Sequence, residues 1–362
     1  MLRKISLKMN VFIPSDDNQP VLDLSAGVSG RLNRKTDGFL NRLGKFKLRE
    51  LAGSADRGLE EKLKVEIRKF LRVSRIVKNN NIVFGFGSYS VLERLAWKLL
   101  PKGLIAGEFP QFRFFPMEYI LAGGSYQGLW SKNFVFPVEQ ILKAIAEEKN
   151  LKVIYINNPN NPTGQVCENE DLIRIIKKAS GRKIFVIIDE VYADLLASEK
   201  TMAGLVNKFD NLIVVRSFSK IFGLSNIRVG YMITGQKIMR AYQNVCNWNE
   251  ITNCGAIMAT EILRDKDYFG KLKKDCFEFK KETINILAKF GFETVPTDPY
   301  VPIIFFRTKK KQDICEYFRS KNIRVDSGKS YQFLGNPCFK DYARIRVPSS
   351  KKDLLTFKER LC

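Results

Sequence analysis

The sequence predicts an α/β protein whose large domain has a mostly parallel β-sheet covered by helices, followed by a smaller C-terminal α/β domain. Two observations lead to this prediction. In the middle of the chain, short runs of β-branched residues alternate with longer stretches of helical periodicity, which is typical of parallel sheets. The chain has 362 residues, of which 45% are apolar, and chains of this length commonly fold as two domains.

Four apolar runs predict the strands of the large sheet. They are IVFGF (82–86), LKVIYI (151–156), KIFVII (183–188) and LIVVRSF (212–218). Directly after the first run and its turn, apolar residues recur at three- and four-residue spacing from Val91 to Leu99. This spacing places them on one face of a helix, so a strand, a tight turn and a helix follow one another here.

The rest of the chain predicts the smaller domain and an arm. Helical periodicity is long from about residue 238 through Phe290, and shorter elements follow at 301–306, 312–321, 323–325 and 343–347. The first forty or so residues have weak periodicity, and we expect them to run across both domains. We therefore divide the chain into an N-terminal arm (1–40), a large domain (41–245) and a small domain (246–362).

The absence of histidine excludes several mechanisms. Because the chain contains no histidine, it can build no Ser/His/Asp triad, Cys/His pair or imidazole-ligated metal. The seven cysteines are scattered and have no CxxC spacing, which argues against a zinc site and a disulfide framework. We expect no bound metal, and any proton transfer must use Lys, Tyr, Asp, Glu or Cys.

The chain is strongly basic, with 61 Lys and Arg against 38 Asp and Glu and a net charge of +23. This charge favours anionic ligands. The basic residues are spread along helical segments and accompany no nucleic-acid recognition motif, so we expect no nucleic-acid partner. No segment reaches the roughly 20 apolar residues of a membrane helix, and the N-terminus has no signal-peptide core. We therefore expect a cytoplasmic protein without a membrane partner.

Polar side chains follow the predicted strands at their carboxyl ends, where ligands bind in open parallel sheets. After the strand at 212–218, Lys220 lies between a serine and a glycine-containing loop. A lysine that is partly buried there would have a lowered pKa and could form a Schiff base. Ser217, Ser219 and Arg228 could bind an anion beside it. A polar junction with a surface lysine is the alternative.

Two other segments carry candidates of the same kind. In IIDEVYADL (187–195), Asp189 ends a buried apolar run, where a carboxylate is costly unless it has a partner such as a protonated ring nitrogen. Capping of the following helix is the alternative for this aspartate. In NNPNNPTG (157–164), Asn161 could reach a ligand oxygen, although such clusters are usually only turns.

A glycine-containing turn follows the strand at 82–86. The backbone N–H groups of Gly87, Ser88 and Tyr89 lie at the N-terminus of the predicted helix, and helix N-termini bind anions. Such a turn is weak support when taken alone, and it gains weight from the other three segments.

In their order and spacing, these segments resemble the class I/II aminotransferases of fold type I, which depend on pyridoxal 5′-phosphate (PLP). The resemblance covers about residues 80–350, and its most specific pieces are NNPNNPTG, DEVY (189–192) and SFSKIFGLSNIRVGY (217–231). It implies PLP as the cofactor, an amino acid and a 2-oxo acid as small-molecule substrates, and a homodimer.

The resemblance also implies a role for each candidate residue. Lys220 is similar to the Schiff-base lysine, and Asp189 to the partner of the pyridine nitrogen. Tyr192 and Asn161 would contact the 3′ oxygen of the cofactor, Phe112 would cover the ring face, and Arg344 would bind the substrate carboxylate. The residues that would surround the phosphate are Gly87, Ser88, Tyr89, Ser217, Ser219 and Arg228. A core position is the alternative for Phe112, and a surface strand is the alternative for Arg344.

These parts suit amino transfer without histidine. PLP is an electron sink when Asp189 keeps its ring nitrogen protonated, and Lys220 can move a proton between Cα and the cofactor. The resemblance favours transamination. Decarboxylation of an amino acid or phospho-amino acid is the alternative. A PLP-binding regulator is a third interpretation, and the lack of room for a DNA-binding domain ahead of the core argues against it.

Within the family, the chain is similar to histidinol-phosphate aminotransferases and threonine-phosphate decarboxylases, with two departures. Asp326 stands where the former usually carry an arginine for the substrate phosphate. Ser54 stands in place of a Tyr/Pro pair through which a neighbouring subunit commonly reaches the site. A carboxylate at position 326 would repel a phosphorylated substrate unless Lys329, Arg31 or Arg113 compensates.

Overall fold

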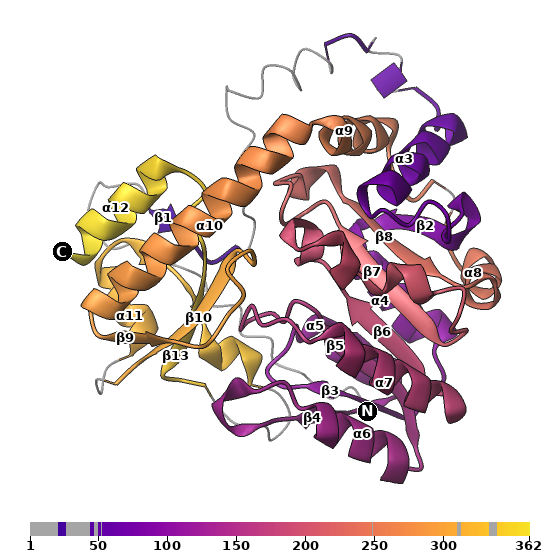
Figure 1. The fold of residues 1–362 in the computed structure, drawn as a ribbon, viewed down its shortest axis with the longest axis horizontal. Helices are drawn as coiled ribbons and strands as arrows, with labels where there is room; N and C mark the ends of the chain where they lie inside the picture. The colour runs from indigo at the N-terminus through magenta and orange to yellow at the C-terminus, as the bar shows by residue number, and fades with distance from the viewer. Residues whose placement is uncertain are drawn as a thin grey trace.

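The large sheet has seven strands and confirms the α/β fold with a mostly parallel sheet (Figure 1). The computed structural model describes residues 21–26, 44–46, 50–51, 53–247, 249–309, 313–332 and 339–362. The strand order is β2-β8-β7-β6-β5-β3-β4, and β8 runs antiparallel to both neighbours. The strands are β2 (Ile82–Phe86), β3 (Leu104–Glu108), β4 (Ser125–Leu129), β5 (Leu151–Asn157), β6 (Phe185–Asp189), β7 (Leu212–Ser217) and β8 (Val229–Thr234).

The four strands expected from the apolar runs are β2, β5, β6 and β7. Sequence patterns missed β3, β4 and β8 as strands. The runs LIAGE and SYQGL of β3 and β4 are short and contain glycine, which has a low strand propensity. They are nevertheless strands because β3 pairs in parallel with both β5 and β4.

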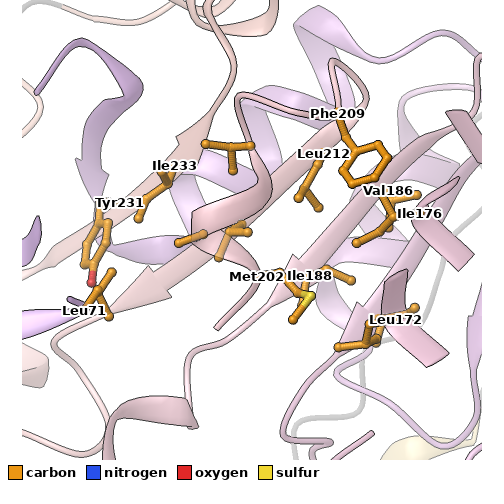
Figure 2. Close-up of a cluster of buried hydrophobic side chains, with 14 of the residues drawn as sticks. Leu71, Leu172, Ile176, Val186, Ile188, Met202, Phe209, Leu212, Tyr231 and Ile233 are labelled. Carbon is orange, nitrogen blue, oxygen red and sulfur yellow. The ribbon is translucent and has the colours of Figure 1, made fainter. Parts of the chain in front are cut away.

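Helices cover both faces of this sheet, which explains why its strands are apolar on both sides. The helices are α3 (Arg57–Phe70), α4 (Gly87–Arg94), α5 (Phe114–Leu121), α6 (Val138–Glu147), α7 (Asn169–Gly181), α8 (Gln236–Gln243) and α9 (Asn253–Arg264). Figure 2 shows one face, where Val186 and Ile188 of β6 lie beside Ile176 of α7. On the other face, Ile187 packs in a separate cluster with Leu95, next to α4.

A smaller antiparallel sheet follows, in the order β12-β13-β10-β9. Its strands are β9 (Phe292–Thr294), β10 (Ile303–Thr308), β12 (Asp326–Ser327) and β13 (Tyr342–Arg346), and its helices are α10 (Lys266–Lys289), α11 (Ile314–Ser320) and α12 (Lys351–Leu361). In Figure 1, α10 extends from the end of α9 to this sheet. A short strand, β1 (Leu22–Asp23), pairs in parallel with β11 (Ile323–Arg324) in a separate two-stranded sheet, and Leu22 belongs to the same apolar core as β10 and β13.

The long helical stretch expected from residue 238 through Phe290 is divided into α8, α9 and α10. Thr252 begins α9 by accepting a hydrogen bond from the Gly255 N–H at 2.9 Å, and Asp265 begins α10 by accepting one from the Tyr268 N–H at 2.9 Å. These are typical N-cap residues. Because α9 packs against α3 and shares its core with the large sheet, the boundary near residue 245 stays a prediction. Among the described helices, none has the length and apolar character to cross a membrane.

Candidate functional site

The carboxyl ends of neighbouring strands bring the candidate residues to one edge of the large sheet. Asn157 at the end of β5 pairs in register with Asp189 at the end of β6, and Ser217 at the end of β7 pairs with Gly230 on β8. The Gly87 turn follows β2, which pairs with β8 as well. Four segments that are far apart in the sequence therefore meet at this edge.

Asp189 is a buried carboxylate at the centre of the site. One oxygen accepts a hydrogen bond from the Tyr155 hydroxyl at 2.8 Å, and the other accepts one from the Val191 N–H at 3.1 Å. Burial raises its pKa to about 6, although these hydrogen bonds and the positive charge of Lys220 lower it. Lys220 itself is partly buried, as expected. A cation placed against Asp189 would keep this carboxylate ionised.

Gly87 and Arg228 form a corner beside the N-terminus of α4. The Gly87 N–H donates to the Arg228 carbonyl at 2.8 Å. Gly87 has a φ of +79°, and a Cβ there would lie 2.4 Å from Arg228 Nη2. A Cβ at Gly230 would lie 2.0 Å from the Ser88 nitrogen. Glycine at both positions therefore allows the guanidinium and β8 to approach the N–H groups that begin α4.

The two serines and Tyr89 complete the surroundings of this corner. The Ser219 N–H donates to the Ser217 Oγ at 3.1 Å, and both serines are buried. The Tyr89 hydroxyl donates to Glu118, so its side chain is anchored to α5. An anion at this corner would meet hydroxyl, N–H and guanidinium donors.

Asn161 and Arg344 come together from the two sheets. The Arg344 Nη1 donates to the Asn161 Oδ1 at 3.0 Å, and its Nη2 donates to the Ser25 carbonyl. The Tyr331 hydroxyl oxygen lies 3.2 Å from the same Asn161 oxygen. Burial lowers the pKa of Arg344, but the phenol of Tyr331 and the carboxylate of Asp326 outweigh this effect and raise the pKa above its ordinary value. The predicted carboxylate-binding arginine therefore belongs to the same site as the residues of the large sheet.

Tyr192 and Phe112 lie near this group. The Tyr192 hydroxyl is buried and makes no hydrogen bond of standard geometry to any described residue, although it lies close enough to the Arg344 guanidinium to help raise the pKa of that group. The Phe112 N–H donates to the Asn157 Oδ1 at 2.7 Å, and its ring is partly buried. An unpaired buried hydroxyl is costly, so a ligand oxygen would be a suitable partner for Tyr192.

Sequence reasoning missed Tyr155, Tyr331 and Glu108. Tyr155 is the one hydroxyl residue in the run LKVIYI, and this could have been a signal. Glu108 ends β3, which the patterns did not predict as a strand. No pattern distinguishes Tyr331 from a core tyrosine, because its partners come from distant segments.

Two of the three cations considered as compensation for Asp326 have other partners. Lys329 is 2.9 Å from Asp313, and Arg113 donates to the Ser330 carbonyl. Arg31 lies outside the described residues.

We expect Glu108→Gln to remove a pH dependence of stability. Glu108 is buried and accepts hydrogen bonds from the Asn157 N–H at 2.7 Å and Asn160 Nδ2 at 3.1 Å. Burial raises its pKa to about 8 from the ordinary 4.5. The folded chain therefore holds a proton that the unfolded chain loses, and the stability from this group falls as pH rises toward 8. Between pH 6 and pH 8, the wild type should lose on the order of 2 kcal/mol more unfolding free energy than the variant. Urea titrations of both proteins at pH 6 and pH 8 test this. An equal change of unfolding free energy between the two pH values in the wild type and the variant would contradict it.

The comparisons with known proteins agree with this arrangement. The family model for aminotransferase class I and II matches residues 33–360. A histidinol-phosphate aminotransferase of Thermoanaerobacter pseudethanolicus is 32% identical over 253 residues, which cover 68% of each chain. The solved histidinol-phosphate aminotransferase of Clostridium acetobutylicum has a TM-score of 0.81 at 22% identity and covers 94% of this chain and 98% of its own. That of Sinorhizobium meliloti, solved with PLP, has a TM-score of 0.77 at 18% identity and covers 94% and 90%.

The match of the family model extends over most of the chain, and the solved relatives share the two-sheet fold. The motifs that carried the resemblance also lie together at one sheet edge. The chain therefore belongs to the aminotransferase class I and II family and is a PLP-dependent aminotransferase of fold type I.

Proposed function

We propose that the chain moves an amino group between an amino acid and a 2-oxo acid, with Lys220 as the residue that attaches PLP. The observation that supports this most strongly is the buried Asp189 carboxylate, which feels the positive charge of Lys220 and has a pKa raised to about 6. A carboxylate with this environment suits the protonated nitrogen of a pyridine ring.

The residues at the sheet edge fit the parts of PLP. Ser217, Ser219 and Arg228, with the Ser88 and Tyr89 N–H groups at the start of α4, would hold the phosphate. Gly87, whose N–H donates to the Arg228 carbonyl, would shape the turn that presents these groups. The unpaired Tyr192 hydroxyl and Asn161 would contact the 3′ oxygen, and the Phe112 ring would cover one face of the pyridine. When bound, PLP supplies an aldehyde for the amino group and a ring that accepts electrons from Cα.

Each remaining residue then has one task. Asp189 would keep the ring nitrogen charged, with Tyr155 holding the carboxylate in place. Lys220, once the substrate amine replaces it, would carry the proton from Cα. Arg344 would orient the substrate by its carboxylate, at a position fixed through Asn161.

The names of the relatives suggest one substrate to test first. The sequence relative and two solved structures are histidinol-phosphate aminotransferases, so a histidinol-phosphate-like amine belongs in any panel of donors. Asp326, in contact with Arg344, opposes an anionic donor of this kind.

A donor panel tests the proposed function. The PLP-loaded protein, mixed with single amino acids, should lose the visible absorbance of the bound cofactor. Pyridoxamine phosphate and an equal amount of 2-oxo acid should form and be measurable by chromatography. Release of CO₂ with unchanged cofactor would establish the decarboxylase alternative, and failure to take up PLP would contradict both.

We also propose a cytoplasmic homodimer. Exposed apolar side chains lie on the elements next to the Gly87 corner: Phe86, Trp97, Phe114 and Leu121. A second copy would cover such a patch. The cysteines of the described residues are free thiols, which suits a reducing compartment. Gel filtration with light scattering should give twice the chain mass, and a monomer at micromolar concentration would count against the dimer.

A further inference from the structure

The pair formed by Asp326 and Arg344 places a carboxylate directly beside the guanidinium proposed to bind the substrate. Asp326 on β12 lies opposite Arg344 on β13 in the sheet register. The Asp326 Oδ2 is 3.1 Å from the Arg344 Nη2 and accepts a hydrogen bond from the Tyr331 hydroxyl at 2.9 Å. The Asp326 Oδ1 accepts one from the Ser330 hydroxyl at 3.0 Å. Three groups therefore fix this carboxylate in place.

The two members of the pair differ in exposure. The Arg344 side chain is 7% exposed, whereas the Asp326 side chain is 29% exposed. Arg344 also donates hydrogen bonds to the neutral oxygens of Asn161 and Ser25, and the Asp326 carboxylate compensates its charge. Asp326 is the member that a ligand can approach. A substrate held at Arg344 consequently meets a negative charge on its way to the guanidinium.

We propose that Asp326 sets the charge of the substrates that this site accepts. It disfavours substrates that bring a second negative group beside Arg344, and it favours amino acids whose side chain is uncharged or cationic. A dianion places two negative charges beside a guanidinium that Asp326 already neutralises, whereas a cationic side chain can pair with the exposed carboxylate. This inference rests on the proposed function, because it takes Arg344 as the carboxylate-binding residue.

A ladder of unreactive acids of equal length tests the inference without turnover. Pentanoate, glutarate and 5-(trimethylammonio)pentanoate differ in the charge at the far end and contain no primary amine. Calorimetric titration of the PLP-loaded wild type should give the weakest binding for glutarate and the tightest for the ammonium acid. In Asp326→Asn, the affinity for glutarate should rise about ten- to hundredfold relative to that for pentanoate, and the affinity for the ammonium acid should fall several-fold relative to that for pentanoate.

Two further variants separate charge from structure. Asp326→Glu retains the charge and should retain the wild-type order. Glu316→Gln removes an exposed carboxylate of the neighbouring α11 that pairs with Arg319 on the same helix, and it should change none of the three affinities. If Asp326→Asn fails to fold, titrations of the wild type at low and high salt still test the inference. High salt screens the charges and should reduce the difference in affinity between glutarate and the other two acids.

The outcomes are distinguishable. Equal changes for all three acids in Asp326→Asn, a wild type that binds glutarate as tightly as the ammonium acid, or an inverted order in Asp326→Glu would each overturn the inference. A protein that shows the expected order and yet transfers no amino group from any donor would overturn the proposed function instead.

Discussion

Replacement of Lys220 by alanine is expected to lower amino transfer by about 10⁴-fold while leaving the protein folded. The lysine has two proposed tasks, covalent attachment of PLP and proton movement at Cα, and loss of a positioned proton carrier alone costs 10²- to 10⁴-fold. The side chain is partly buried at the end of β7 and is not part of the apolar cores of the large sheet. Its truncation should therefore cost little stability.

Borohydride treatment provides the measurement. In the wild type, reduction should fix PLP to the chain, and mass spectrometry of a proteolytic digest should place the added mass on the peptide with Lys220. The alanine variant should bind PLP reversibly and lose it on dialysis. Lys178→Ala, an exposed lysine on α7, is the matched control and should behave as the wild type. Attachment at another lysine would refute the assignment.

Arg216→Met is expected to give the largest loss of stability. Arg216 is 2% exposed and pairs with two buried carboxylates, Glu190 at 2.5 Å and Asp194 at 2.7 Å. Methionine fills a similar volume and leaves both carboxylates without their cation. Removing one partner of a buried ion pair costs about 3–5 kcal/mol, so the variant should unfold at much lower urea concentration.

The pH dependence and a surface control test the cause of this loss. Burial raises the pKa values of Glu190 and Asp194, and that of Asp194 reaches about 6 although the charge of Arg216 lowers both values. Without Arg216 both pKa values should rise further, so the variant should regain stability as pH falls and the folded chain takes up protons. Arg174→Met breaks an exposed version of the same pairing, with Glu139 and Asp171, and should change the unfolding free energy far less, because solvent screens exposed ion pairs. Equal losses in both variants would refute the argument.

Local sequence determined the elements that are continuous apolar runs. The apolar runs of β5, β6 and β7 predicted strands. The motifs around Asn161, Asp189 and Lys220 predicted which polar side chains at the ends of these strands would contact a ligand. Their convergence needed only one rule, that carboxyl ends of parallel strands lie at the same edge. For this reason the fold class and the region of the site could be read without coordinates.

Tertiary structure alone decided the strands and contacts that depend on distant partners. β3 and β4 are strands because of their neighbours, since their own residues have weak strand propensity. Three contacts join residues that are 18 to 34 positions apart in the chain. They are the hydrogen bond from Tyr155 to Asp189, the ion pairs of Arg216 with Glu190 and Asp194, and the ion pair of Asp326 with Arg344. Nothing in the spacing of such residues encodes which atoms meet, because the distance between them is set by the packing of whole sheets and helices. The sequence already suggested that Asp326 would affect substrate binding, but its pairing with Arg344 became visible only in the folded protein.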